Sequence, residues 1–427
     1  MRWLLVFWIF VLSAVAYLDR VNISVAGSSI AAEYHLSNLQ LGYVFSSFLV
    51  GYAIFQAPAG RLADALGPRR VIAFAVVWWG VFTALTAGIP VGAAGSLVIF
   101  VSIRFLLGSG EAILYPASNQ FVARWIPTTE RGIANGWIFA GVGAGAGLTP
   151  PFVATIMIHH GWRASFWISA SIGIAVGAVW FILARDAPEH HPWVTPSELA
   201  TIESGLTLSG ASAGHDEHKS QLPWKRILAN KEVLAMAGSY FTYGYAAWIF
   251  FSWFFIYLAK VRGLNLKASA DFAMLPFLAM AAGSPIGGII SDALTRRLNK
   301  RLGRCVFAFA VMTLAAAFLT SGAYVRSAPL ASVVLAGGAG ALYLSQSCYW
   351  SISADIGGPS AGSVSGVMNM GGQIGGALTA SLTPAIAAHY GWTASFGTAG
   401  VLCLLGGLAW LLVNPERSLA SGASAPG

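Results

Sequence analysis

The chain has 427 residues, of which 56% are hydrophobic and only 9% are charged. Soluble globular domains carry about 25% charged residues, so this composition excludes a surface that mostly faces water. The net charge of +8 does not indicate a nucleic-acid partner, because the basic residues lie in short loops between apolar segments.

Apolar segments long enough to cross a bilayer follow one another along the chain. A spanning helix needs ~20 mostly apolar residues, and charged residues, glycine and proline mark the loops between such segments. We therefore predict an all-α membrane protein of about twelve transmembrane helices, surrounded by lipid. The predicted helices are 3–31, 39–62, 70–90, 94–122, 132–157, 164–184, 231–259, 268–292, 303–324, 330–351, 360–387 and 393–413.

The first of these segments contains Ala14-Val15-Ala16, which resembles a signal-peptidase site. The apolar stretch resumes at Val21 and runs to Ala32, which is too long for a signal peptide. We therefore expect an uncleaved first transmembrane helix.

A polar region divides the predicted helices into two equal groups. The sequence predicts an N-terminal six-helix bundle at 1–184, a central loop at 185–230, a C-terminal six-helix bundle at 231–413 and a tail at 414–427. Most of the 24 Lys and Arg residues fall on the side that holds both termini. Because cytoplasmic loops are rich in Lys and Arg, we expect the termini, loop and tail to be cytoplasmic, in the inner membrane of a bacterial-type cell.

The two halves also resemble each other. GRLADAL begins at Gly60 and GIISDAL at Gly288, while GWRASF begins at Gly161 and GWTASF at Gly391. Each pair is separated by about 230 residues, and the order is the same in both halves. An even number of helices per half gives the repeats the same orientation, so we predict two parallel six-helix repeats.

The segment GRLADALGPRR, from Gly60 to Arg70, resembles the loop between helices two and three of the major facilitator superfamily. GGIISDALTRR, which ends at Arg297, stands where that family repeats the loop. Glycine permits close helix contact, aspartate can cap a helix end, and arginine anchors at the cytoplasmic interface. We expect these segments to form a conformational latch between the halves. The predicted latch residues are Gly60, Asp64, Arg69, Arg70, Asp292 and Arg296.

Two further segments narrow the resemblance. YLDRVNISVA, from Tyr17 to Ala26, and RFLLGSGEAILYPASNQFVARWIPTTERG, from Arg104 to Gly132, are similar to the anion:cation symporter branch of that family. The branch includes bacterial carriers of galactonate, glucarate and hexuronates, and animal carriers of organic anions and phosphate. The resemblance implies proton-coupled uptake of a small organic anion, most simply a sugar acid (hexonate, hexuronate or aldarate), by rocking of two halves around a central site.

Apart from helix ends, four ionisable residues fall at membrane depth: Asp19, Arg20, Arg104 and Glu111. A charge at mid-bilayer costs about 2.5–3.5 kcal/mol on insertion scales, so such residues usually mark a pathway. The structural alternative is a pair of buried ion pairs that only orders two helices. Asp19 and Arg20 are adjacent and therefore point about 100° apart on a helix, toward different neighbours.

Roles for these residues follow from the resemblance. In the family, the position of Arg20 reads the substrate carboxylate, and Asp19 and Glu111 stand where the protonatable pair lies. We expect Arg104 to tune proton coupling by pairing with Asp19. The proton is then the coupling ion, and we predict no other cofactor and no metal site. The remaining predicted substrate-binding residues are Tyr17, Tyr52, Tyr243, Trp248, Gln346, Trp350, Asn369 and Gln373, with packing as the alternative for the aromatic rings.

Other functions remain open to test. Antiporters of the superfamily often have a Gly-Pro pair in helix five, whereas here Gly141 to Gly147 run on to Pro150 without one, which favours symport. The polar amide that galactonate carriers have near Val142 is absent. An antiporter or facilitator for an aromatic or dicarboxylic acid is the alternative on the same fold.

Two further classes are disfavoured. A membrane enzyme would need a catalytic constellation that the sequence lacks, and a sensor would need a signalling domain that neither the central loop nor the tail offers. We expect a functional monomer.

Overall fold

The computed structural model describes residues 1–36, 38–92, 95–207, 222–254, 257–264, 266–417 and 419. Part of the predicted central loop (208–221) and most of the predicted tail (418 and 420–427) lie outside these ranges. The described residues are almost entirely helical and include no strand. This confirms the all-α prediction.

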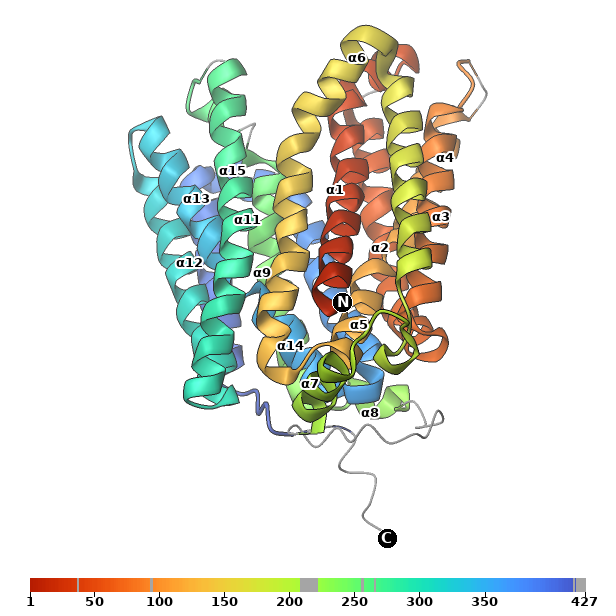
Figure 1. The fold of residues 1–427 in the computed structure, drawn as a ribbon. Coiled ribbons are helices and arrows are strands. Elements are labelled where there is room, and N and C mark those ends of the chain that lie inside the picture. The colour runs from red at the N-terminus through yellow and green to blue at the C-terminus, as the bar shows by residue number, and fades with distance from the viewer. Residues whose placement is uncertain are drawn as a thin grey trace.

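The helices of the first half of the chain lie together and are drawn red to yellow in Figure 1. The fourth and fifth continue each other, and the sixth bends at Gly161, where φ is 77° and only glycine is comfortable. The helices are α1 (Arg2–Glu33), α2 (Asn38–Leu66), α3 (Pro68–Ala87), α4 (Ser96–Glu111), α5 (Leu114–Trp125) and α6 (Arg131–Leu183), with the short turn η1 (Thr128–Glu130) before α6.

The second half repeats this plan in the helices drawn green to blue. Its last long helix bends at Gly391, where φ is 82°, so the two sequence-related glycines make the same kink. The elements are α9 (Lys231–Ser252), η3 (Tyr257–Val261), α11 (Leu266–Arg297), η4 (Arg301–Val306), α12 (Phe307–Tyr324), α13 (Ala328–Leu344), α14 (Gln346–Gly357), η5 (Gly358–Ser360) and α15 (Ala361–Trp410).

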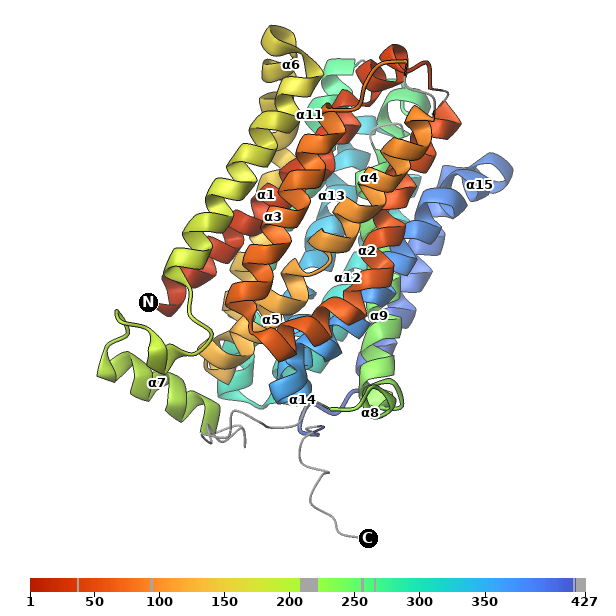
Figure 2. The ribbon, with the colours of Figure 1, turned by 90° about the vertical axis from the view of Figure 1, so that its right-hand side faces the viewer.

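The described part of the predicted central loop contains three short helical elements: η2 (Pro188–His190), α7 (Pro196–Thr207) and α8 (Trp224–Leu228). These elements lie at one end of the bundle, where the amino group of Met1 is 2.8 Å from the carboxylate of Glu198 on α7. We call this the loop-bearing end (Figures 1 and 2). The kinks of α6 and α15 lie at the opposite end.

Eight helical stretches of the described residues are long and apolar enough to cross a membrane. Their lipid-facing sides carry exposed Leu, Ile, Val, Phe and Trp side chains, as expected of a surface surrounded by hydrocarbon. The stretches are Arg2–Gly27, Pro68–Ala87, Ser96–Trp125, Thr155–Leu183, Asp271–Arg297, Arg301–Tyr324, Ala328–Thr379 and Ala385–Trp410.

Glycines set how closely the helices approach one another. A Cβ atom at Gly108 on α4 would lie 2.2 Å from the carbonyl oxygen of Phe48 on α2. A Cβ at Gly145 on α6 would lie 2.3 Å from the carbonyl oxygen of Ala14 on α1. Such backbone-to-backbone contacts are how membrane helices pack without a hydrophobic driving force between them. They bring α4 against α2 and α6 against α1; α1 and α4 carry the membrane-depth charges.

Candidate functional site

Two carboxylates tie the halves together near the loop-bearing end. Asp64 on α2 accepts hydrogen bonds from the backbone N–H groups of Gly362 and Ser363, at 2.9 and 2.8 Å, in the first turn of α15. It also accepts a hydrogen bond from the Ser363 hydroxyl. The first N–H groups of a helix have no partner within the helix and favour negative charge. We call this set the Asp64 contact.

The second half supplies the matching contact with the roles reversed. Asp292 on α11 accepts hydrogen bonds from the backbone N–H groups of Gly132 and Ile133, at 3.0 and 2.6 Å, in the first turn of α6. We call this the Asp292 contact. Asp64 and Asp292 hold corresponding positions in the repeat, so each half caps a helix of the other half.

The Asp292 contact carries an ion pair that the Asp64 contact lacks. The guanidinium of Arg304 lies 2.6 Å from Asp292, and both side chains are fully buried. Close by, Arg131 forms a second buried ion pair with Asp355 at 2.5 Å. Arg296, a predicted latch residue, donates across the halves to the carbonyl oxygen of Thr129 at 3.1 Å.

The other predicted latch residues behave differently from one another. Gly60 packs against the backbone of Gly362, so close that a Cβ there would lie 2.1 Å from the Gly362 oxygen. Arg69 stays within its own half, donating its backbone N–H to Asp186 at 2.8 Å and its Nε–H to Phe181 at 3.0 Å. Arg70 is exposed.

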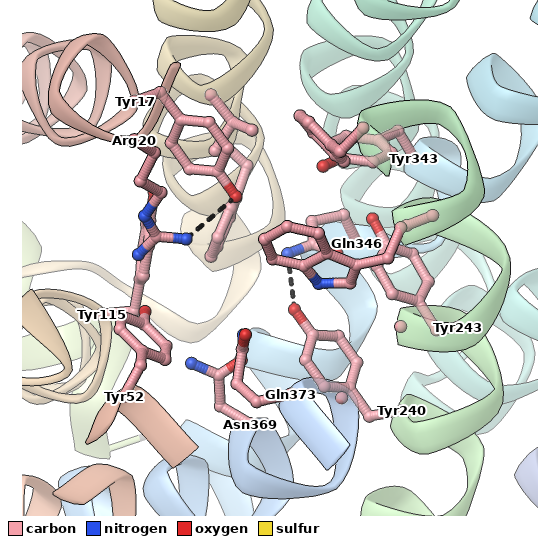
Figure 3. Close-up of a pocket in the computed structure, with 17 residues that line it drawn as sticks. Tyr17, Arg20, Tyr52, Tyr115, Tyr240, Tyr243, Tyr343, Gln346, Asn369 and Gln373 are labelled. Atoms are coloured by element: carbon pink, nitrogen blue, oxygen red, sulfur yellow. Dashed lines mark hydrogen bonds between the residues drawn. The ribbon is translucent and has the colours of Figure 1, made fainter. Parts of the chain in front are cut away.

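A cavity lies between the halves and encloses about 450 Å³ of empty space, a figure that includes open solvent. Figure 3 shows Tyr17, Arg20, Tyr52 and Tyr115 on one side, and Tyr240, Tyr243, Tyr343 and Gln346 on the other. The lining residues are Tyr17, Arg20, Tyr52, Tyr115, Phe139, Val142, Tyr240, Tyr243, Gly244, Ala247, Trp248, Phe251, Tyr343, Gln346, Asn369, Gly372 and Gln373.

Arg20 supplies the cavity wall with a positive charge. Its Nε–H donates to Glu111 on α4 at 2.6 Å, and its Nη1–H donates to the Tyr17 hydroxyl at 3.3 Å. The guanidinium carbon lies 4.6 Å from the ring centre of Tyr17 and 4.5 Å from that of Tyr52. Its Nη2 is buried and has no hydrogen-bond partner among the described residues. A planar guanidinium with an unpartnered Nη2 is suited to donate hydrogen bonds to a carboxylate.

Asp19 and Arg104, which the sequence predicts as a pair, make no hydrogen bond or ion pair with each other among the described residues. Neither carboxylate oxygen of Asp19 has a hydrogen-bond partner in the described part of the chain, and Nε and Nη1 of Arg104 also lack one. Arg104 instead lies over the ring of Phe48, 4.9 Å from its centre. The ion pair at this depth joins Arg20 on α1 and Glu111 on α4.

Amides line the cavity where the two halves meet. The Nε2–H of Gln56 on α2 donates to the Ala112 carbonyl oxygen at 2.6 Å, which leaves its Oε1 to accept from Nδ2 of Asn369 on α15 at 2.5 Å. On the wall formed by the second half, Nε2 of Gln346 donates to the Tyr240 hydroxyl at 2.9 Å. Asn369 therefore links the halves as well as lining the cavity.

The predicted substrate-binding residues converge on this cavity with one exception. Arg20, Tyr17, Tyr52, Tyr243, Trp248, Gln346, Asn369 and Gln373 all line it. Trp350 does not; it is 1% exposed, and its ring packs against those of Tyr115 and Phe139 behind the wall. Asp19, Arg104 and Glu111 lie behind the lining as well, with Glu111 in contact with it through Arg20.

Sequence reasoning missed several lining residues. The ring of Tyr240 stacks on that of Tyr243, with 4.9 Å between the ring centres, and the ring of Tyr343 lies tilted against Tyr243 at 5.8 Å. Together the three rings form an aromatic wall. Gln56, which is not itself among the lining residues, was also missed; it accepts a hydrogen bond from Asn369 of the opposite half. The spacing of Tyr240 and Tyr243, three residues apart on α9, was a signal that the two rings share a helix face.

The Major Facilitator Superfamily model matches residues 9–380 of the chain. The chain belongs to this family. Membership confirms the predicted resemblance and makes the chain a multi-pass membrane transporter rather than an enzyme.

Curated relatives of the chain are anion transporters. A "probable sulfoacetate transporter" of Cupriavidus necator is 33% identical over 409 residues, covering 95% of this chain and 92% of the relative. A "probable galactarate/D-glucarate transporter" of Bacillus subtilis is 31% identical over 300 residues, covering 69% of this chain and 66% of the relative.

The fold matches a solved transporter over nearly the whole chain. The proton:xylose symporter XylE superimposes with a TM-score of 0.71 at 17% identity, covering 98% of both chains. This likeness concerns the architecture alone.

Proposed function

We propose that the chain takes up a small organic anion, a sugar acid of the hexonate, hexuronate or aldarate class, by symport with protons. In this proposal the chain crosses the membrane twelve times. The kinked helices α6 and α15 each cross it twice, and α2 and α9 cross it in addition to the helices that contain the apolar stretches. In the proposal the chain lies in the inner membrane of a bacterial-type cell, with both termini in the cytoplasm. A monomer is the functional unit. The Lys and Arg bias of the loops supports this orientation.

The observation that carries the proposal is the state of Arg20. This guanidinium reaches the cavity with a free Nη2 and is held from behind by the buried carboxylate of Glu111. A substrate carboxylate competes with Glu111 for the same cation. Protonation of Glu111 releases Arg20 for the substrate and removes a negative charge beside it, so anion and proton bind together.

The contacts between the halves support alternating access. In the proposal, the Asp64 and Asp292 contacts close the loop-bearing end, and the substrate enters from the opposite end. Breaking both contacts would open the cavity to the loop-bearing end. Of the six predicted latch residues, the four that contact the other half act at this step in the proposal: Gly60, Asp64, Asp292 and Arg296.

An aromatic acid is the second candidate substrate on the same fold, moved by exchange or facilitated diffusion. The observation in its favour is the number of rings around the cavity, among them Tyr240, Tyr243 and Phe251. Stacked rings bind a flat substrate well.

Uptake into proteoliposomes separates these possibilities. Labelled D-gluconate, D-glucuronate, D-glucarate and benzoate would be offered under an imposed pH gradient, with and without the same unlabelled anion inside. Symport predicts accumulation that follows the pH gradient without internal anion. Accumulation only with internal anion indicates exchange, and indifference to the gradient indicates facilitated diffusion; either contradicts the proposal. The same uptake would be measured for Glu111→Gln. Its matched control is Glu33→Gln, a carboxyl change on α1 away from the cavity.

A further inference from the structure

The charge on the cavity wall is unusually one-sided. Among the described lining residues, Arg20 is the one charged side chain, and it belongs to the first half. The wall contributed by the second half consists of tyrosines, amides and apolar groups. A solute that bridges the cavity therefore meets a cation at one end only (Figure 3).

The polar atoms on the second wall include acceptors that lack partners. Oε1 of Gln346 and Oε1 of Gln373 are buried and have no hydrogen-bond partner among the described residues. The hydroxyl of Tyr243 is also unpartnered. The amide oxygens accept hydrogen bonds from solute hydroxyls, and the Tyr243 hydroxyl can donate or accept, but none of these groups carries a charge to balance a carboxylate. This wall is therefore suited to a neutral, hydroxyl-bearing end of the solute.

The second guanidinium near the site, that of Arg104, does not add a charge to the cavity lining. Arg104 is 2% exposed, lies over the Phe48 ring and is absent from the cavity lining. A second carboxylate at the far end of an extended diacid would lose its water and find no countercharge. Burying an unpaired charge costs several kcal/mol, far more than the gain from hydroxyl contacts.

We infer that the transported solute is a monoanion, with one carboxylate on Arg20 and a neutral polyhydroxylated end against Gln346, Gln373 and Tyr243. This inference rests on the proposed function and narrows it to hexonates and hexuronates, excluding extended dicarboxylates such as aldarates. It also separates this chain from its Bacillus subtilis relative, whose name refers to two such dicarboxylates.

Binding of three acids with the same six-carbon skeleton tests the inference. D-gluconate and D-glucuronate carry one carboxylate, and D-glucarate carries two. Their affinities for the purified full chain would be measured at pH 7 by isothermal titration calorimetry, where all the carboxylates are ionised. We expect at least one of the monoanions to bind at least 10-fold more tightly than D-glucarate, and Arg20→Gln to abolish this binding.

A gain-of-charge variant tests the cause. Gln373→Lys places a cation on the second wall and should raise the affinity for D-glucarate relative to the monoanion by at least 10-fold; Gln346→Lys serves if that variant does not fold. An unchanged ratio in a folded variant would overturn the inference. D-glucarate binding to the wild type as tightly as the monoanions would overturn it too, while leaving anion transport intact. If none of the three acids binds, the proposed function fails with it.

Discussion

The two halves of the molecule are nearly alike where they close and unlike where they meet the solute. The Asp64 and Asp292 contacts use the same geometry at corresponding repeat positions. At the cavity, the first half presents Arg20, backed by Glu111, whereas the second presents rings and amides. Closure needs contacts from both halves, whereas the proposed recognition of a monoanion needs a charge on one wall only.

The charged wall should matter far more for binding than the neutral wall. Arg20→Gln removes a charge-assisted contact worth several kcal/mol, so we expect affinity for the bound monoanion to fall by about 100-fold or more. Gln373→Ala removes one neutral hydrogen bond and should cost about 3–10-fold. Calorimetry on both purified variants measures the difference. Similar losses from the two changes would mean that the walls share the recognition.

The two closing contacts should differ in stability despite their shared geometry. Asp292→Asn leaves Arg304 buried without a countercharge, which costs about 3–5 kcal/mol. Asp64→Asn leaves only neutral donors and should cost about 1 kcal/mol. Thermal unfolding in detergent would rank the variants. Adding Arg304→Met to Asp292→Asn should recover part of the loss, and equal losses from the two single changes would refute the distinction.

Small substitutions at the paired glycines should affect both contacts equally. A Cβ at Gly60 would lie 2.1 Å from the Gly362 oxygen, and one at Gly288 would lie 2.2 Å from the Gly132 oxygen. Overpacking of this kind costs about 1–3 kcal/mol and would push the halves apart at the loop-bearing end. Cysteine labelling at that end should therefore rise in Gly60→Ala and Gly288→Ala. Gly147→Ala, with no atom within 4 Å, is the control and should leave labelling unchanged.

The smallest effect should come from an ion pair outside the membrane-spanning segments. Glu33 accepts from Trp162 Nε1 at 2.6 Å and from Arg163 at 2.7 Å, and the Trp162 hydrogen bond, followed by Arg163, lowers the pKa of Glu33. A lowered pKa stabilises the fold above the ordinary value of 4.5, and that stabilisation is lost as the pH falls through the folded pKa. Glu33→Gln should cost about 0.5 kcal/mol at pH 7 and less at pH 3. An equal cost at both values would rule out this origin.

The sequence predicted the family and eight of the seventeen residues that line the cavity, because both depend on local pattern. The repeat motifs at Gly60 and Gly288 identify corresponding positions, and amides at membrane depth, such as Asn369 and Gln373, must face a partner or a cavity. The central loop was predicted as polar, and its helices α7 and α8, which are 12 and 5 residues long, were not predicted.

The pairing of the buried charges could not be predicted in the same way. Whether Glu111 meets Arg20 depends on the rotation of α1 relative to α4, which is set by glycine contacts among several helices. Spacing along one helix fixes which residues share a face but not which neighbour that face meets. Trp350 shows the same limit, since its place behind the wall rather than in it depends on how α14 packs against α5 and α6.

Proton uptake on anion binding tests the central claim most directly. The purified chain would be mixed with D-gluconate or D-glucuronate in weakly buffered solution containing a pH indicator. We predict that the wild type takes up protons as the anion binds, and that Glu111→Gln binds the anion with a clearly smaller uptake, while Glu33→Gln behaves as the wild type. Anion binding to the wild type without proton uptake, or undiminished uptake in Glu111→Gln, would contradict the account.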